Sequence, residues 1–369
     1  MQTGSPATHV SWSPTAGASG GNSTCKENSE FPHFLYAVTY TVILVPGLIG
    51  NVLALWVFYG YIRETKRAVI FMINLAVADL MQVLSLPLRI FYYLHRSWPF
   101  GPGLCLFCFY LKYVNMYASV YFLVCISVRR FGFLMFPFRF TDAKRQGDVL
   151  VSLAGWVVVG LACLPFPLLR LGGVDPSVAG NITGAAAGSG HSPGPHNATC
   201  FVDLPTLQHL SLGQALALLG VAELLGFCAP LLAILYCSWK AALSLRQKGP
   251  VPQDLGEKKK ALKMILTCAA VFLICFAPYH ISFPLDFLVK ANKIDGCLAR
   301  RLIQTFHPVA LCLASLNSCL DPALYYFTTD EFRRRLSRQD LQESLPLSTR
   351  PFSSPRGPSQ NGHVQPGAG

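Results

Sequence analysis

The sequence predicts an all-α membrane protein: a seven-transmembrane helix bundle followed by a short amphipathic eighth helix. Only 13% of its 369 residues are charged, against about a quarter in an ordinary soluble chain. Hydrophobic residues make up 52% of the chain, and the mean hydropathy is +0.41. Apolar runs long enough to cross a bilayer occur seven times, at 34–59, 68–94, 103–128, 149–170, 210–239, 262–289 and 302–327.

The third run organises the rest of the chain. From Cys105 to Arg130 it advances 25 residues, or roughly 38 Å at about 1.5 Å per residue, which spans a bilayer. Lys112, Asn115 and Ser119 precede the arginine pair that ends this run, at intervals that place the polar groups on one helix face. This helix therefore connects the two sides of the membrane.

Orientation follows from the short loops. The net charge of +12 fits an excess of Lys and Arg in the inner loops better than a nucleic-acid site. The inner loops and tail carry Arg63, Lys66, Arg67, Arg139, Lys144, Arg145, Lys240, Arg246, Lys248, Lys258, Lys259, Lys260, Arg333, Arg334, Arg335 and Arg338. The third outer loop, also basic, is an exception. The bias predicts a multi-pass plasma-membrane protein with its N-terminus outside.

Glycosylation sequons give an independent check on this topology. Asn22, Asn181 and Asn197 each begin an Asn-x-Ser/Thr sequon on a segment predicted to lie outside. We expect an extracellular glycosylated N-terminus over 1–33, with export driven by the first spanning helix because no cleavable signal is present. The second outer loop, 171–205, is long and aperiodic.

The chain beyond the seventh run divides in two. Residues 328–340 contain Phe332 and Leu336 four apart among basic residues, which predicts an amphipathic helix on the inner membrane surface. Ser, Pro, Gly and Gln dominate 341–369, which predicts a disordered cytoplasmic tail.

Thirteen cysteines are present, and nine lie within apolar runs where Cys packs as a small hydrophobe. The four that remain for disulfides are Cys25, Cys105, Cys200 and Cys297. Cys105 and Cys108 form a CxxC pair without a second Cys/His pair at zinc spacing, so we expect no structural zinc.

Polar residues inside spanning helices are expensive and therefore candidates for function. Asp79 lies mid-helix in NLAVADL, and Asn51 lies at a corresponding depth of the first helix. With these two, a partly hydrated cavity is expected to contain Asn115, Ser119, Asn317 and Asp321. Their oxygens would suit an allosteric sodium ion; the alternative is a purely structural hydrogen-bond network.

Two prolines interrupt the last two spanning runs. Pro278 in FLICFAPYH and Pro322 in NSCLDPALYYF each remove a backbone donor and are expected to kink their helices. Such kinks are either static architecture or the hinges on which the inner helix ends swing apart.

Several motifs together resemble the marker positions of the rhodopsin-like G-protein-coupled receptors, over about residues 31–340. They are Asn51 in GLIGN, Asp79 in NLAVADL, Cys105 and Arg130 at the ends of the third helix, Trp156, Pro230, Pro278 in CFAPY, and Asp321-Pro322 through Tyr325. The aspartate of DPALYY, and Phe276 where tryptophan is more usual, resemble the purinergic-like branch. IFMINLAVADLMQVLSLPLRIFYYL, CFYLKYVNMYAS and SFPLDFLVK resemble the lysophosphatidylserine receptors within it.

The resemblance implies disulfides from Cys105 to Cys200 and from Cys25 to Cys297, and a ligand among the outer helix halves. The ligand-binding residues expected there are the cations Arg89, Arg170 and Lys290, the tyrosines Tyr92, Tyr93, Tyr113 and Tyr279, and Phe201. Such a cluster suits a phosphate with a second acidic group beside it, because guanidinium groups pair bidentately with both. Lysophosphatidylserine fits; a nucleotide or lysophosphatidic acid is the alternative.

Some of these assignments have a plainer reading. Arg170 and Lys290 could instead snorkel to the membrane interface, whereas Arg89 sits within its helix after Pro87. A role for Lys112 is left open, and Asp286 could hold the ligand amine or a neighbouring cation. A small transporter or channel, and still more an enzyme, fits the sequence less well, because neither an inverted repeat nor a nucleophile–base pair is evident.

At the inner end, the resemblance assigns activation and coupling to heterotrimeric G proteins to Arg130, Phe276, Pro278 and Tyr325. Arg129 stands where the family usually has an acidic residue, so we expect Arg130 to lose its usual partner and basal activity to be high. Glu257 is an alternative partner. The resemblance points to the Rho-activating and adenylyl-cyclase-stimulating G-protein classes, with arrestin and kinases as further partners and no partner nucleic acid.

Overall fold

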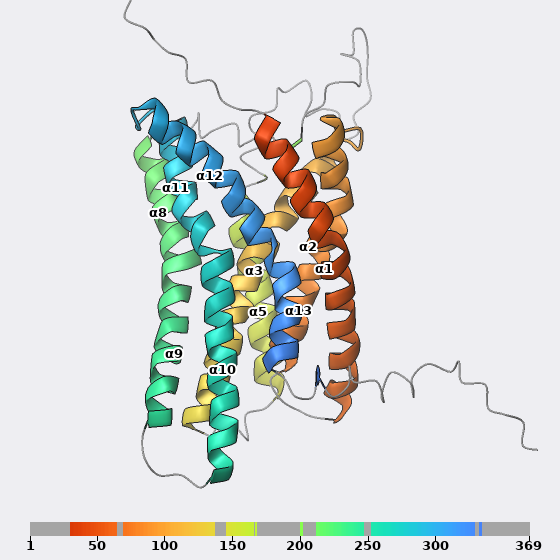
Figure 1. Cartoon of the computed structure of the whole chain (residues 1–369), viewed down its shortest axis with the longest axis vertical. Coiled ribbons are helices and arrows are strands. Elements are labelled where there is room, and N and C mark those ends of the chain that lie inside the picture. Colours follow the sequence, from red (N-terminus) through yellow and green to blue (C-terminus); the bar gives the residue numbers. More distant parts are fainter. Residues whose placement is uncertain are drawn as a thin grey trace, which may run out of the picture.

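The computed structural model describes residues 30–64, 69–136, 145–165, 167, 200–201, 212–246, 252–328 and 332–333. They form helices that run side by side in one bundle (Figure 1). The first four are α1 (Glu30–Glu64), α2 (Val69–His95), α3 (Pro102–Met135) and α5 (Arg145–Cys163). α1 and α3 contain the predicted runs 34–59 and 103–128 and extend beyond them, and α2 is displaced by one residue from the predicted 68–94. α5 begins four residues before the predicted run 149–170 and ends at Cys163.

The remaining three membrane-crossing segments are each divided. The fifth consists of α8 (Leu212–Glu223), the π-helix η2 (Leu224–Cys228) and α9 (Ala229–Arg246). The sixth consists of α10 (Pro252–Cys275) and α11 (Ala277–Lys290), and the seventh of α12 (Cys297–Ser315) and α13 (Asn317–Thr328). Within the described residues, six segments are long and apolar enough to cross a membrane. The α12–α13 segment completes the seven-helix bundle, although Arg300 and Arg301 and a row of buried polar residues make it less apolar.

The bundle has two distinguishable ends. Cys105 lies in the first turn of α3, and Arg130 lies near its last turn. We call these the disulfide end and the Arg130 end. In α2, thirteen residues are buried, including Asp79, Gln82, Ser85 and Arg89. These four polar residues recur every three or four positions, so one buried face of α2 connects the two halves of the bundle.

The sixth segment breaks where its proline predicts. Phe276 separates α10 from α11, and Pro278 occupies the first turn of α11. A proline is tolerated in a first helical turn, because the backbone N–H that it lacks has no helical partner there. Buried Phe276 thus marks the joint between the two halves of this segment.

The seventh segment behaves differently from the expectation of a kink at Pro322. Its interruption falls at Leu316, six residues earlier, and Pro322 lies inside α13. Pro322 has no N–H for the carbonyl of Ser318, four residues back. Asn51 donates to that carbonyl from α1 at 2.7 Å, and donates also to Gly47 O at 2.9 Å. The proline therefore creates an acceptor that links α13 to α1.

Of the predicted amphipathic helix, only residues 332 and 333 lie within the described part, and both are helical. Phe332 is buried, with its ring 5.7 Å from Phe58 and 6.3 Å from Tyr325, measured between centroids. Phe332, one residue of the predicted apolar side, thus packs against Phe58 of α1 and Tyr325 of α13.

Candidate functional site

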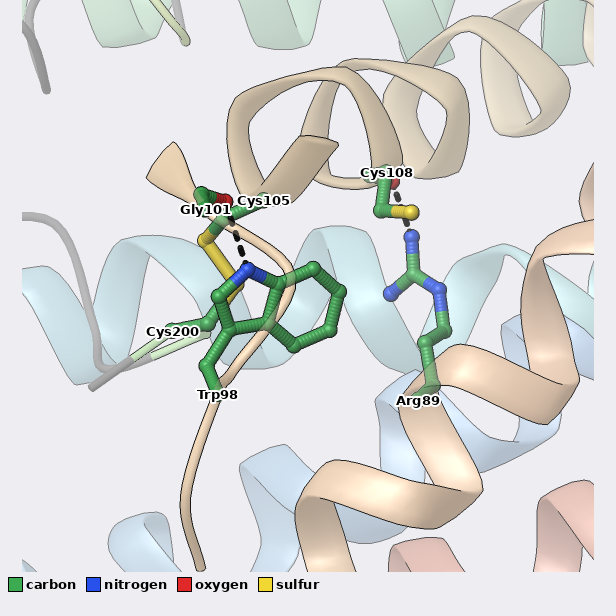
Figure 2. Close-up of a disulfide and its surroundings, with 6 residues drawn as sticks. All are labelled: Arg89, Trp98, Gly101, Cys105, Cys108 and Cys200. Carbon is green, nitrogen blue, oxygen red and sulfur yellow. Dashed lines mark hydrogen bonds between the residues drawn. A yellow bond between two sulfur atoms is a disulfide. The ribbon is translucent and has the colours of Figure 1, made fainter. Parts of the chain in front are cut away.

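At the disulfide end, Cys105 of α3 is bonded to Cys200, with the two Cα atoms 5.8 Å apart. This confirms the first predicted disulfide (Figure 2). Cys297 is also disulfide-bonded, whereas Cys25 lies outside the described residues. Phe201 follows with a φ of 51°, in the left-handed region that non-glycine residues seldom adopt. Its ring lies 5.4 Å from that of Tyr92 and 5.5 Å from that of Trp98.

Arg89 reaches from α2 into this region and is only 1% exposed. Its Nε donates to Ser85 Oγ at 3.3 Å, and its Nη2 donates to the backbone carbonyl of Cys108 (Figure 2). Its guanidinium carbon lies 4.8 Å from the centroid of the Phe201 ring. All these partners are neutral, and among the described residues Arg89 forms no ion pair. The guanidinium is therefore a buried positive charge without a carboxylate beside it.

Aromatic residues adjoin Arg89. The Tyr93 ring lies 4.8 Å from that of Tyr36 and 6.1 Å from that of Phe201. Deeper in the bundle, Tyr113 packs against Phe109. Tyr279 of α11 is buried and stacks on Phe283 at 5.4 Å. The structure thus brings Arg89, Tyr93 and Phe201 together, whereas Tyr113 and Tyr279 lie further toward the middle.

The other expected ligand cations differ from Arg89. Lys290 is the last residue of α11, and its Nζ lies 2.8 Å from Asp286 Oδ2. Asp286 is therefore the structural partner of this lysine, one of the two roles open for it. Lys112 is half-buried, with its Nζ 6.0 Å from the Tyr113 centroid. Arg170 and the sequon residues Asn22, Asn181 and Asn197 lie outside the described residues.

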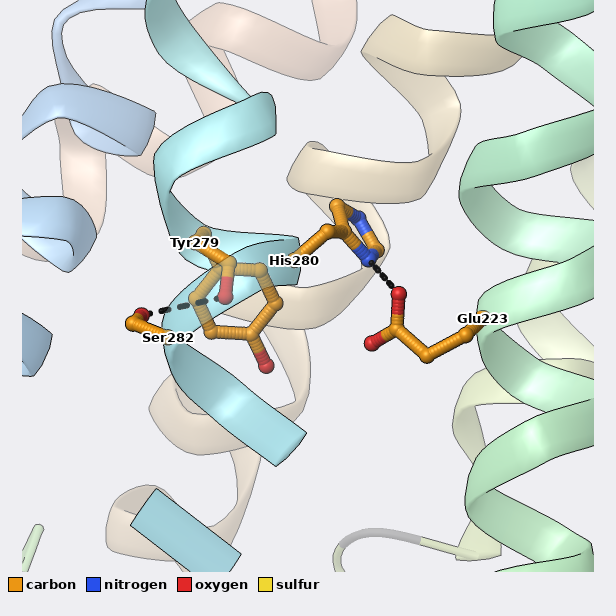
Figure 3. Close-up of polar contacts among 4 residues, drawn as sticks. All are labelled: Glu223, Tyr279, His280 and Ser282. Atoms are coloured by element: carbon orange, nitrogen blue, oxygen red, sulfur yellow. Dashed lines mark hydrogen bonds and ion pairs between the residues drawn. The ribbon is translucent and has the colours of Figure 1, made fainter. Parts of the chain in front are cut away.

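A second charged group lies between the fifth and sixth segments, and the sequence reasoning missed it. Oε2 of Glu223, the last residue of α8, lies 2.9 Å from Nδ1 of His280 on α11 (Figure 3). The His280 ring stacks on Phe227 of η2 at 4.7 Å and meets the Tyr117 ring of α3 at 5.9 Å. The sequence does contain a signal that could have located this pair: Glu223 is an acidic residue within the apolar run 210–239. The π-helix that begins directly after Glu223 has no comparable signal in the sequence.

The predicted sodium-site residues converge in the middle of the bundle. Asp79 Oδ1 accepts from Asn115 Nδ2 at 3.1 Å and from Asn317 Nδ2 at 3.4 Å. The same Asn317 nitrogen donates to Ser119 Oγ at 2.9 Å. Asp321 lies near enough to Asp79 to interact with it, and both are fully buried. Asp79 Oδ2 and both Asp321 oxygens accept no hydrogen bond from the described residues.

Three buried carboxylate oxygens of Asp79 and Asp321 accept no hydrogen bond from the described residues, and they show whether this site suits a cation. Two adjacent buried carboxyls cannot both stay ionised without a counter-charge, since burial and like charge each penalise the second negative charge. Either a proton or a metal ion would satisfy them. The oxygen donor set of Asp79, Ser119 and Asp321 fits sodium, a cation that prefers oxygen ligands.

At the Arg130 end, the two arginines are held differently. Arg129 Nη2 lies 3.1 Å from Asp148 Oδ2, so an ion pair connects α3 to the first turn of α5. Arg130 lies near enough to Cys268 of α10 to interact with it. The sequence-based expectation did not include Asp148 as a partner of Arg129. It named Glu257 as an alternative partner of Arg130, and the side chain of Glu257 lies outside the described part. Tyr325 Oη donates to Met72 O at 3.2 Å, connecting α13 to α2.

This seven-helix architecture, with a disulfide at one end of α3 and an arginine at the other, defines a membrane receptor. The profile of the 7 transmembrane receptor (rhodopsin family) matches residues 50–325, and the chain belongs to that family. It is therefore a multi-pass receptor and not an enzyme, and family membership implies heterotrimeric G proteins as partners.

Similarity to individual receptors narrows the class. The chain is 66% identical over 337 residues to the human protein named "Probable G-protein coupled receptor 174", covering 90% of this chain and 96% of that protein. It is 50% identical to a human protein whose provisional name is that of a purinoceptor, covering 84% and 86%. Human lysophosphatidic acid receptor 4 is 33% identical, with 92% and 88% covered. These relatives agree with the purinergic-like branch that the motifs indicated.

Proposed function

We propose that this receptor binds an anionic lysophospholipid, most specifically lysophosphatidylserine, at the disulfide end, which faces the outside of the plasma membrane. The observation that carries this proposal is the buried Arg89, whose described partners are all neutral. A buried unpaired charge costs several kcal/mol, so the site is suited to a ligand that brings a negative charge. Guanidinium groups pair bidentately with phosphate.

The surroundings of Arg89 favour a lipid phosphate over a nucleotide. Of the other expected ligand cations, Lys290 already pairs with Asp286, whereas the triphosphate of a nucleotide needs several cations. The lysophosphatidic acid receptor among the relatives supports a phosphate-bearing lipid; the purinoceptor name keeps the nucleotide as the second candidate. The acyl chain would lie between apolar outer helix halves.

The test compares ligand potency in Arg89 variants at matched surface expression. Arg89→Ala should weaken activation by lysophosphatidylserine about ten- to a hundredfold, the equivalent of a charged hydrogen bond. Arg89→Lys should lose most of that potency as well, because lysine keeps the positive charge but lacks the planar guanidinium group that binds phosphate through two hydrogen bonds. The matched control is Arg300→Ala, which removes an exposed cation at the same end, hydrogen-bonded to Asn292.

Full response of Arg89→Ala would contradict this site. Activation by nucleotides with no response to any lysolipid would instead favour the second candidate. Lys290→Ala should have a smaller effect than Arg89→Ala, because its ammonium already contacts Asp286.

Signalling is proposed to occur at the Arg130 end, which faces the cytoplasm. The G-protein classes proposed are the Rho-activating and adenylyl-cyclase-stimulating ones, with arrestin and kinases acting on the active receptor. The joint at Phe276 and Pro278 supports a swing of α10 away from Arg130. High basal activity remains part of this proposal, because Arg129 supplies no carboxylate to Arg130.

Three further assignments complete the proposal. An allosteric sodium ion would be held by Asp79, Asn115, Ser119, Asn317 and Asp321, and the unused carboxylate oxygens support it. A Cys25–Cys297 disulfide would tie the N-terminus to the start of α12. Glycans would be carried by Asn22, Asn181 and Asn197.

A further inference from the structure

Glu223 is the feature of this molecule that the proposed function leaves unused. Its carboxylate points from the end of α8 toward His280 and α11 (Figure 3). The Glu223 side chain is 17% exposed, and that of His280 is fully buried. A carboxylate at this depth of a spanning segment is costly unless something offsets its charge.

The described polar contact of the Glu223 carboxylate is with a histidine. Nδ1 of His280 lies 2.9 Å from Glu223 Oε2, and in the Nδ1–H tautomer it donates a hydrogen bond to that oxygen. His280 Nε2 is buried and has no hydrogen-bond partner among the described residues. The hydrogen bond therefore orients the carboxylate, and part of the Glu223 side chain stays exposed.

No Lys or Arg compensates Glu223 within the described part of the chain, since its only ion-pair contact there is His280. The other described carboxylates near this end differ. Glu30 is exposed and pairs with Arg96, Asp286 pairs with Lys290, and Asp295 is exposed on the connection between α11 and α12. In the interior of the disulfide half, Arg89 is thus a described cation without a carboxylate partner, and Glu223 is a described carboxylate without a Lys or Arg partner.

Their positions along α3 are compatible with one headgroup. Arg89 contacts the Cys108 carbonyl, and His280 contacts Tyr117, nine residues further along α3. This is a separation of about 13 Å along the helix axis, measured between the two points on α3 that these groups contact. Between them lies Tyr113, a residue expected to face the ligand. A ligand with a phosphate at one side and an ammonium group at the other would complement both charges.

We infer that Glu223, oriented by its hydrogen bond to His280, binds the ammonium group of the ligand and makes the receptor select amine-bearing lysophospholipids. This inference rests on the proposed function and names the ligand class within it: an anionic headgroup that also carries an ammonium group. His280 acts as a positioning residue. Lysophosphatidic acid lacks the amine and leaves Glu223 uncompensated.

The experiment uses two ligands that differ only in the amine. They are lysophosphatidylserine and its deamino analogue, in which 3-hydroxypropionate replaces serine. In cells expressing the full chain, the amine should improve potency about ten- to a hundredfold. Glu223→Gln keeps an acceptor for His280 but removes the charge. It should bring the two potencies within about threefold of each other, by weakening lysophosphatidylserine alone.

The deamino ligand supplies the internal folding control, since its potency should be the same in Glu223→Gln as in the unaltered receptor. Asp295→Asn removes an exposed carboxylate on the connection between α11 and α12, and it should preserve the preference for the amine. Equal potency of both ligands on the unaltered receptor would overturn the inference. It would also be overturned by an undiminished preference in Glu223→Gln, by loss of the preference in Asp295→Asn, or by an equal fall for both ligands in Glu223→Gln. Failure of both ligands to activate the unaltered receptor would instead refute the proposed function.

Discussion

Single polar side chains in this bundle connect helices by donating to backbone carbonyls of a neighbouring helix. Arg89 reaches the carbonyl of Cys108, and Tyr325 reaches that of Met72. Asn51 takes the Ser318 carbonyl that Pro322 leaves without a helical donor. Such bonds matter in a membrane core because no water replaces a lost partner there.

Replacing Asn51 tests this contribution. Asn51→Ala should lower the stability of the purified receptor by about 1–3 kcal/mol, because the buried Ser318 carbonyl is left unsatisfied. Thermal unfolding in detergent would measure the effect. Thr305→Ala, which removes an exposed side chain bonded only to Arg301 O one turn back, should leave the midpoint nearly unchanged. Equal midpoints for both variants would contradict the role given to Asn51.

At the scale of helices, the contacts between α3 and its neighbours decide how its two ends are held. Glycines let α5 approach closely: a Cβ on Gly155 would overlap the Tyr121 ring, and Tyr110 donates to Gly160 O at 2.9 Å. At the Arg130 end, the Arg129–Asp148 pair adds a charged tie. α3 is thus fixed to α5 along its length, while the sixth segment beside it carries the Phe276 joint.

The charge at position 129 should control basal signalling. Arg129→Asp places a carboxylate beside Arg130, so basal activity should fall roughly fivefold at equal surface expression, equivalent to about 1 kcal/mol of coupling. The same change breaks the pair with Asp148, and Arg129→Ala separates the two effects because it breaks the pair without adding a carboxylate. Basal signalling in Arg129→Ala should not fall. An unchanged basal level in Arg129→Asp would refute the proposal that the inactive state lacks a carboxylate restraint on Arg130.

For the whole molecule, the buried polar face of α2 leads from the disulfide end to the middle of the bundle through Arg89, Ser85, Gln82 and Asp79. Uncharged polar residues thus lie between the charged Arg89 and Asp79. Asp79 also meets α3 and α13 through Asn115 and Asn317. A change in the charge of Asp79 therefore alters contacts among α2, α3 and α13 at the same time.

Sodium should stabilise the whole bundle through this centre. In sodium chloride at ten times the dissociation constant, the unfolding free energy should rise by about 1.4 kcal/mol relative to choline chloride at equal ionic strength. Asp79→Asn should abolish this difference, whereas Asp148→Asn should retain it. Thermal unfolding of the purified receptor in both salts is the measurement. A sodium effect that persists in Asp79→Asn would contradict the assignment of the ion to this site.

The sequence by itself determined the number of spanning segments, their approximate extents and the family. Lipid requires about 20 apolar residues per crossing, and this is a local property of composition that can be read along the chain. Local motifs also located Arg89, Asp79 and Phe276. Only the tertiary structure decided the partners: Asp148 for Arg129, Asp286 for Lys290 and His280 for Glu223. Pairs between helices depend on how each helix is rotated about its axis and how deeply it packs, and apolar sequence does not encode that rotation locally.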